Sequence, residues 1–532
     1  MSQQSWLDVV DRKLAQRAKA LSRFADVKVT TAITDEHDIE SLRTQISAGD
    51  VTVEEVVADY IAKSYAAHKV TNCKSFTEII FADALERAKE LDKIAKEDRS
   101  KLPLFGVPVT LKDQFDVAGY DSTIGYVGRA FSPAEEDGAL VKILKSQGAV
   151  ILAKTNLPQS IMWCETENPM FGLTVNPFDP NYTPGGSTGG ESALLASHGS
   201  LLGWGTDIGG SIRIPSHMMG LYGLKPTSCR LPYRGVPVST DGQEHVPSSV
   251  GPLARSLNSI YIAMKAVIDA EPWQHDSRCA PVPWRSNAYD DAISGSRSLV
   301  FGVLRFDGVV QPHPPVARVL DETVSKLKAA GHHVVEWDAS LHAELVAVMD
   351  AFYSADGGED IRRDVARGGE PFIPHVARLV DRGPAISVYE YWQLNKRKLT
   401  LQNAYLDKWN SLLCEETGTA VDAVILPPMP HTAVPHKSCA WVGYTKVWNV
   451  LDYPALVLPA GKVSSEDLAV PWTLDEAEAK HPMDVANIKL WTKHGARMAD
   501  LELPVGIQLV CRRLEEEKLI GIGKVVDSIL KS

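Results

Sequence analysis

Short apolar runs alternate with helical patterns along most of this chain of 532 residues. Runs rich in Val, Ile and Leu, which are typical of buried strands, lie at 105–111, 149–155, 299–304, 423–428 and 455–461. Segments between such runs, for example 138–148 and 316–331, are predicted helices. Because strands that are apolar throughout need cover on both faces, the alternation predicts an α/β fold around a buried mixed β-sheet.

No linker or internal repeat divides the chain. The sequence has no Ser/Gly tract, charge block or low-complexity run, and its apolar fraction of 44% is typical of a globular protein with a large core. We therefore expect one domain over residues 41–532, preceded by a helical arm over residues 1–40. This arm is expected either to pack on its own subunit or to make a homodimer contact.

Charge and hydropathy exclude several classes of protein. The net charge is −12 with mixed signs, so the chain lacks the basic stripe of a nucleic-acid-binding protein and would be repelled by an anionic membrane. The N-terminus lacks the apolar region of a signal peptide, and no window of eighteen apolar residues occurs. We expect a cytoplasmic protein without nucleic-acid or membrane partners.

The cysteines and histidines give no sign of a metal site. Seven cysteines, an odd number without C-x-x-C spacing, argue against disulfides and against a zinc site. The pair His332-His333 and the segment 431–436 lack metal-ligand spacing with acids. We expect no metal and no cofactor, and we interpret Cys164 as a buried structural cysteine.

The segment 184–216 contains the strongest candidates for catalytic residues. It contains two serines with glycine neighbours, Ser187 and Ser211, and Lys112 follows the predicted strand 105–111 directly. A serine hydroxyl needs a base to act as a nucleophile, and a lysine can be that base when burial keeps it neutral. The pattern therefore predicts a serine hydrolase whose base is not a histidine.

Two other interpretations of the Ser187 loop are weaker. The sequence GGSTG matches the nucleophile elbow of α/β-hydrolases, but that elbow follows a strand, and residues 176–184 have the composition of a turn. A phosphate-binding loop would end in G-K-[ST], whereas here Glu191 follows the glycines.

The motifs LKD, GGSTGGE and DIGGSIRIPS stand together as they do in the amidase signature family. The chain resembles this family over nearly its whole length, and most of all the fungal acetamidases and general amidases. The resemblance implies a Ser–cis-Ser–Lys triad, in which Ser211 is the nucleophile and Lys112 is the base. Ser187 would be the bridging serine, joined to Gly186 by a cis peptide bond.

The resemblance also implies binding and supporting roles. The substrate site and oxyanion hole would comprise Ile161, Ser187, Ile208, Gly209, Gly210 and Ser211. The supporting residues would be Asp207, Arg213 and Thr188, the last in place of a second serine that is common in the family.

The implied fold is a single large α/β/α sandwich, with a signature core at about 105–260 and a variable substrate-pocket region at about 340–450. The implied activity is hydrolysis of linear carboxamides, from small aliphatic to aryl amides, to a carboxylate and ammonia or an amine. Two alternatives remain open: the A subunit of a tRNA-dependent amidotransferase, and a non-catalytic binding protein that keeps the fold. The polar segment 463–503 is expected to be a surface excursion.

Overall fold

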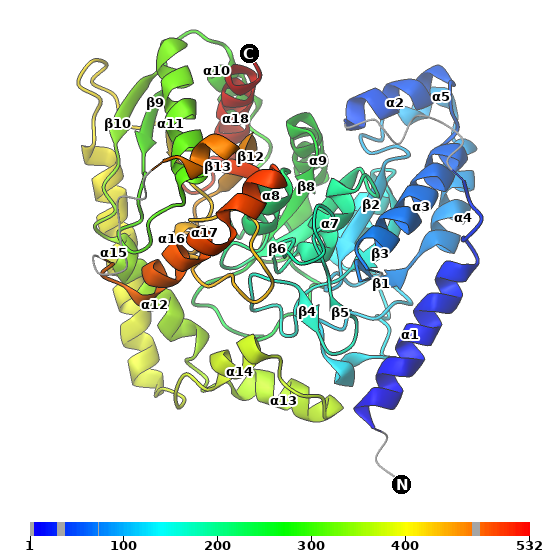
Figure 1. Ribbon diagram of the computed structural model, residues 1–532. Coiled ribbons are helices and arrows are strands. Elements are labelled where there is room, and N and C mark those ends of the chain that lie inside the picture. The colour runs from blue at the N-terminus through cyan, green and yellow to red at the C-terminus, as the bar shows by residue number, and fades with distance from the viewer. Residues whose placement is uncertain (1–4, 29–37, 73, 471–478) are drawn as a thin grey trace.

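The computed structural model describes residues 5–28, 38–72, 74–470 and 479–532 (Figure 1). Within them, eleven strands form one mixed sheet in the order β1-β3-β2-β6-β8-β7-β12-β13-β11-β9-β10. The strands are β1 (Phe76–Ile79), β2 (Pro108–Lys112), β3 (Val150–Thr155), β6 (Leu202–Asp207), β7 (Tyr222–Lys225), β8 (Ser249–Ala254), β9 (Val300–Val303), β10 (His333–Glu336), β11 (Ala423–Leu426), β12 (Ala455–Lys462) and β13 (Pro504–Val510). A separate pair, β4 (Glu167–Asn168) and β5 (Gly172–Leu173), lies outside this sheet. The predicted α/β fold with a mixed sheet is confirmed.

Parallel pairs occupy two parts of the sheet. Strand β2 runs parallel to both β3 and β6, and β9 runs parallel to both β10 and β11. The central strands pair antiparallel, including β6 with β8 and β12 with β13. Because β2 and β6 are parallel neighbours, their carboxyl ends meet at one edge, and this edge carries the candidate site.

Helices cover both faces of the sheet. The principal ones are α2 (Ile39–Ala48), α3 (Val53–Val70), α4 (Phe81–Asp92), α6 (Ala139–Ser146), α7 (Gly189–Ala196), α8 (Arg213–Met219), α9 (Leu257–Asp269), α10 (Ser286–Ile293), α11 (Pro314–Ala329) and α18 (Glu516–Lys531). A Cβ placed on Gly506 of β13 would lie 3.3 Å from His217 of α8, and one placed on Gly523 of α18 would lie 2.5 Å from Leu456 of β12. Leu456 pairs with Leu509 of β13, so these two side chains point to the same face of the sheet. Gly506 lies three residues before Leu509 on the same strand and therefore faces the other side. Helices α8 and α18 thus cover opposite faces of the sheet.

The N-terminal helix α1 (Trp6–Ser22) packs on its own subunit. The Lys13 ammonium is buried in an ion pair with Glu78 of β1 and with Asp121, whose carboxylate oxygen is 2.6 Å away. Arg17 donates to the carbonyl of Phe76 at 2.6 Å. Figure 1 shows α1 lying along the β1 end of the molecule. The part of the predicted arm at residues 29–37 lies outside the described residues.

Five helices follow between residues 340 and 450: α12 (His342–Tyr353), α13 (Glu359–Gly368), α14 (Pro374–Val380), α15 (Val388–Ser411) and α16 (Gly443–Val450). Figure 1 shows α13 and α14 along one edge of the molecule, with α12 and α15 at the end farthest from α1. Of these five, α12, α14 and α16 contribute residues to the cavity described below. None of the described helices is both long enough and apolar enough to cross a membrane.

The segment 463–503 connects β12 to β13 outside the sheet, as expected of an excursion, but part of it also packs against the core. The segment contains a 19-residue helix, α17 (Pro482–Asp500), which begins with a proline in its first turn. Its buried positions include Ile488, Trp491 and Met498, but Asp484 and Asn487 share the buried face. These polar residues interrupt the apolar stripe by which an amphipathic helix is recognised in a sequence. Residues 471–478 of this segment lie outside the described part.

Candidate active site

A lysine and a serine meet at the carboxyl end of β2. Lys112 is the last residue of that strand and is fully buried, and its Nζ lies 2.6 Å from Ser187 Oγ and 3.0 Å from Thr206 Oγ1. Ser187 lies in the loop before α7, and its peptide bond to Gly186 is cis, as expected. Residues 174–188 contain no strand, which agrees with the rejection of a nucleophile elbow.

Burial controls the ionisation of Lys112. Loss of solvent around the ammonium lowers the pKa to about 7, although the negative charge of Asp207 acts in the opposite direction. A large fraction of Lys112 is therefore neutral near pH 7. A neutral amine at hydrogen-bonding distance from a hydroxyl can accept its proton, so the pair has the properties of a general base.

Ser211 lies in a second loop, between β6 and α8. Its side chain is half-buried and lines a cavity, and its carbonyl accepts a hydrogen bond of 3.2 Å from the Thr188 amide. This bond joins the two serine loops. Among the described residues, no hydrogen bond links Ser187 Oγ to Ser211 Oγ, so a proton relay between them requires the Ser211 side chain to move when substrate binds.

A buried ion pair holds the Ser211 loop. Asp207 and Arg213 have no exposed side-chain surface, and two of the guanidinium nitrogens donate to the carboxylate at 2.9 Å. Burial alone would raise the pKa of Asp207, but the charge and hydrogen bonds of Arg213 outweigh this effect and keep the pKa well below its usual range. The same carboxylate accepts the amides of Gly210 at 2.8 Å and Ile212 at 3.1 Å.

The amides of the predicted oxyanion hole are not equivalent. Within the described residues, those of Ile208, Gly209 and Ser211 have no protein acceptor, and all three residues line the cavity. The Gly210 amide is already engaged by Asp207. The geometry therefore leaves three amides available for an oxyanion, and Gly210 instead helps to fix the loop.

Sequence reasoning missed four residues that support this loop. Thr445 donates to the carbonyl of Gly209 at 2.6 Å, Asn449 donates to Asp207, and Tyr353 donates to the carbonyl of Ile208 at 3.2 Å. Gln508 accepts from Arg213 at 2.8 Å. They come from α12, α16 and β13, far from the motif in sequence, and no local pattern marks them. Thr206 was also missed, although its position at the end of β6 beside β2 is a usable signal.

The cavity beside Ser211 has a volume of about 590 Å³. Its apolar wall includes the predicted residue Ile161, together with Met162, Trp163, Ile214, Leu379 and Val442. Ser160 and Ile161 both adopt the left-handed backbone region, which is rare for residues with a side chain and is often found at functional sites. Cys164 and Cys439 also line the cavity and are free thiols.

The histidines singled out from the sequence lie elsewhere or bond to backbone. The buried His431 and the partly exposed His436 contact the carbonyls of Thr432 and Pro180. His333 forms a group with Cys414 and Glu416 in which one ligand atom from each lies within 4.8 Å of the others. This group lies beside β10, at the far edge of the sheet from β2, so it is separate from the Lys112–Ser187 pair.

The chain is similar to known proteins both in sequence and in fold. A family model described as Amidase matches residues 55–520. The chain is 51% identical over 529 residues to Amidase 1 of Gibberella moniliformis, with 99% of each chain covered. It is 37% identical over 514 residues to the Acetamidase of Emericella nidulans, covering 95% of this chain and 90% of the relative. Among solved structures, a fatty acid amide hydrolase superposes with a TM-score of 0.83 at 28% identity, over 98% of this chain and 90% of the other.

Proposed function

The chain belongs to the amidase signature family and is an amidase, and from this premise we propose that it hydrolyses linear carboxamides through an acyl-enzyme on Ser211. The observation that supports the proposal is the distance of 2.6 Å between the buried Lys112 amine and Ser187 Oγ. The loop that contains Ser187 is hydrogen-bonded to the loop that contains Ser211. The substrates would range from small aliphatic to aryl amides. The products would be a carboxylate and ammonia or an amine.

The first half-reaction forms the acyl-enzyme. Neutral Lys112 accepts the proton of Ser187 Oγ, Ser187 accepts that of Ser211 Oγ, and Ser211 attacks the carbonyl carbon. The negative oxygen of the tetrahedral intermediate receives hydrogen bonds from the amides of Ile208, Gly209 and Ser211. When the C–N bond breaks, Lys112 returns its proton through Ser187 to the leaving nitrogen, which makes an amine an adequate leaving group.

The second half-reaction releases the acid. A water molecule takes the position vacated by the amine and loses a proton to the same Ser187–Lys112 pair as it attacks the acyl carbon. Ser211 then leaves and regains its proton. The Asp207–Arg213 pair takes no part in proton transfer, because Asp207 stays ionised and fully hydrogen-bonded while it fixes the nucleophile loop.

Covalent labelling tests the assignment. A fluorophosphonate probe should label the wild-type protein at Ser211, and Ser211→Ala should abolish both labelling and amide turnover. Cys164→Ser, which alters another side chain of the same cavity, is the matched control and should still be labelled. Labelling mapped to Ser187 or Cys164 would contradict the assignment, and a wild-type protein without labelling or turnover would favour the non-catalytic alternative.

A further inference from the structure

The cavity beside Ser211 carries a cationic rim. Four of its lining residues are basic: Arg378, Arg382, Lys437 and Lys446. No Asp or Glu among the described residues lines it. In a chain of net charge −12, a set of only basic charged residues around the reactive cavity is opposite in sign to the protein as a whole. Clefts lined by one sign of charge concentrate ligands of the opposite sign.

The Arg378 guanidinium has a neutral partner. His375, one turn earlier on α14, accepts a hydrogen bond of 2.6 Å from Arg378 through Nδ1, and its ring stacks on Trp163 at 4.2 Å between centroids. Burial and the nearby charge of Arg378 lower the pKa of His375 to about 4, so the imidazole is uncharged at neutral pH. This stack fixes the guanidinium at the cavity and leaves its positive charge uncompensated by any described carboxylate.

Arg382 and Lys446 share one carboxylate. Asp350 of α12 lies 2.5 Å from the Lys446 ammonium and 3.4 Å from Arg382. Lys446 is also close to the reaction centre, because its Cγ lies 3.8 Å from the position that a Cβ on Gly209 would occupy. Two cations against one anion leave a net positive charge here, a short distance from the loop that bears Ser211.

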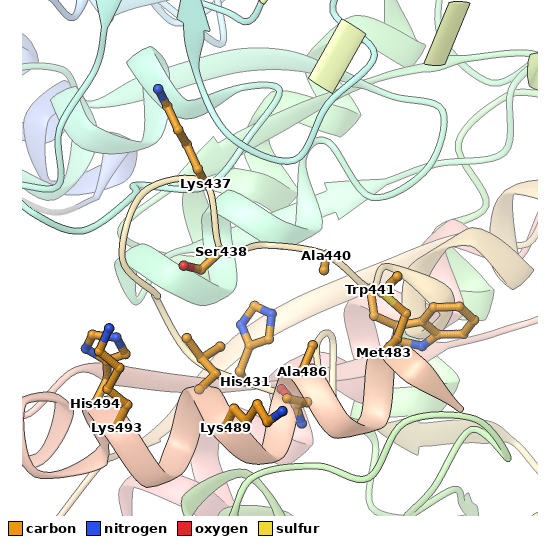
Figure 2. A pocket seen from close by; sticks show the side chains of 12 residues that line it. His431, Lys437, Ser438, Ala440, Trp441, Met483, Ala486, Lys489, Lys493 and His494 are labelled. Carbon is orange, nitrogen blue, oxygen red and sulfur yellow. The ribbon is translucent and has the colours of Figure 1, made fainter. Parts of the chain in front are cut away.

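A second basic groove adjoins the cavity. It has a volume of about 370 Å³ and shares Lys437, Ala440, Met483 and Ala486 with the cavity of Ser211. Figure 2 shows the loop from Lys437 to Trp441 facing helix α17, with Lys493 and His494 farther along that helix. Lys437 points away from α17, towards Glu167 at 3.8 Å. No described carboxylate lines this groove either, so the positive lining continues beyond the reactive cavity.

We propose that the preferred substrates are amides that carry a carboxylate, separated from the scissile amide by an apolar spacer. The carboxylate lies at three of the four rim residues, Arg378, Arg382 and Lys446, because Lys437 points towards Glu167. The spacer lies against the apolar wall that includes Ile161 and Leu379. Arginine binds a carboxylate through two parallel hydrogen bonds, which suits the exposed Arg378. This inference rests on the proposed function, because it concerns the selectivity of the Ser211 site.

Matched substrates test the charge preference. Three primary amides of similar length differ in the group at the far end of the chain. Hexanamide is neutral there, the monoamide of adipic acid is negative and 6-aminohexanamide is positive. N-hexanoyl-β-alanine and N-hexanoyl-propylamine make the same comparison with the charge on the amine side, and so distinguish a carboxylate on the acyl part from one on the leaving group. We expect kcat/KM for at least one anionic amide to exceed that of its neutral partner about tenfold at low salt. The cationic amide should be the poorest, and the preference should shrink as ionic strength rises.

Variants test the residues. Arg378→Gln and the double variant Arg378→Gln/Arg382→Gln should reduce the ratio of anionic to neutral kcat/KM about tenfold, mainly through KM. Arg363→Gln is the matched control, because Arg363 is an exposed arginine of α13 paired with Glu359 and should leave the ratio unchanged. In Ser211→Ala protein, calorimetry should detect binding of the adipic monoamide more strongly than that of hexanamide.

The outcomes separate the two proposals. Equal or better hydrolysis of the neutral amides, or a ratio that does not respond to Arg378→Gln and its double variant, overturns the charge preference and leaves the serine mechanism intact. Suppose that the protein binds anionic amides selectively but the wild type shows neither turnover nor labelling of Ser211. This result supports the preference of the rim for anionic ligands and overturns the proposed function. Absence of both selective binding and turnover overturns both proposals.

Discussion

The proposed mechanism requires the rate to follow the ionisation of Lys112. Because its pKa is about 7, we expect kcat/KM to rise about tenfold per pH unit below pH 6 and to become level above about pH 8. An exposed lysine with the ordinary value of 10.5 would be neutral in only about 3 molecules in 10,000 at pH 7. Burial therefore increases the available base more than about 1,000-fold at pH 7. The difference between pKa values of 10.5 and about 7 corresponds to about 5 kcal/mol between the two protonation states.

The same shift gives a stability prediction with a definite sign. The Lys112 pKa is lower in the folded chain than in the unfolded chain, so the unfolded chain binds more protons between about pH 7 and 10.5. This residue therefore makes stability rise with pH over that window, and it contributes no further change below pH 7. An activity loss between pH 8 and 6 should be reversible and should occur without unfolding, which circular dichroism at each pH checks.

Two buried carboxyl groups could produce a similar pH profile and must be separated from Lys112. Burial raises the pKa of Glu165 to about 7 and that of Glu191 to about 8. Glu165→Gln and Glu191→Gln should keep the ionisation near pH 7. Lys112→Ala should lose at least about 100-fold in kcat/KM, and its residual rate should no longer follow that ionisation. Ammonia release from an unactivated amide between pH 5 and 10 is the assay. A pH profile that survives Lys112→Ala, or one that vanishes in Glu165→Gln, would refute the assignment.

Three further predictions concern the rest of the site and the fold. Ser187→Ala should reduce amide hydrolysis less than Ser211→Ala and should retain slow acylation by activated esters, measured as a burst of the leaving group, because such leaving groups need little protonation. Lys13→Met should lower the free energy of unfolding by about 3–5 kcal/mol in denaturant titrations, because it leaves Glu78 and Asp121 unpaired where they are buried. Dialysis against a chelator should leave the rate unchanged, and an activity loss that zinc restores would contradict a metal-free mechanism.

Much of the fold was predictable because most strands are nearly continuous apolar runs. The run at 105–111 covers all of β2 except its last residue, Lys112, and the run at 149–155 contains β3. Strand β8 was missed, although it lies between β6 and β7 in the sheet. It contains Gly251 and Pro252, residues that weaken a strand prediction, and its place depends on pairing with strands from elsewhere in the chain.

The chemistry of the site was more predictable than its selectivity, for a physical reason. Ser187 and Ser211 lie in glycine-rich loops whose backbone conformations need particular residues in consecutive positions, so the local sequence records them. A Cβ on Gly210, for example, would lie 2.4 Å from Thr445 Oγ1 at a φ of +131°. The basic rim has no such local constraint.

The rim is assembled from separate helices. Arg378 belongs to α14 and Lys446 to α16. Asp350, which pairs with Lys446 and Arg382, belongs to α12. Each is an ordinary charged residue of a helix surface in the sequence, and only the packing of these helices around Ser211 brings them together. A chain can therefore keep the serine loops intact while exchanging such rim residues. Reversing the charge of Arg378 alone, as in Arg378→Glu, should consequently turn the preference away from anionic amides while Ser211 remains open to labelling.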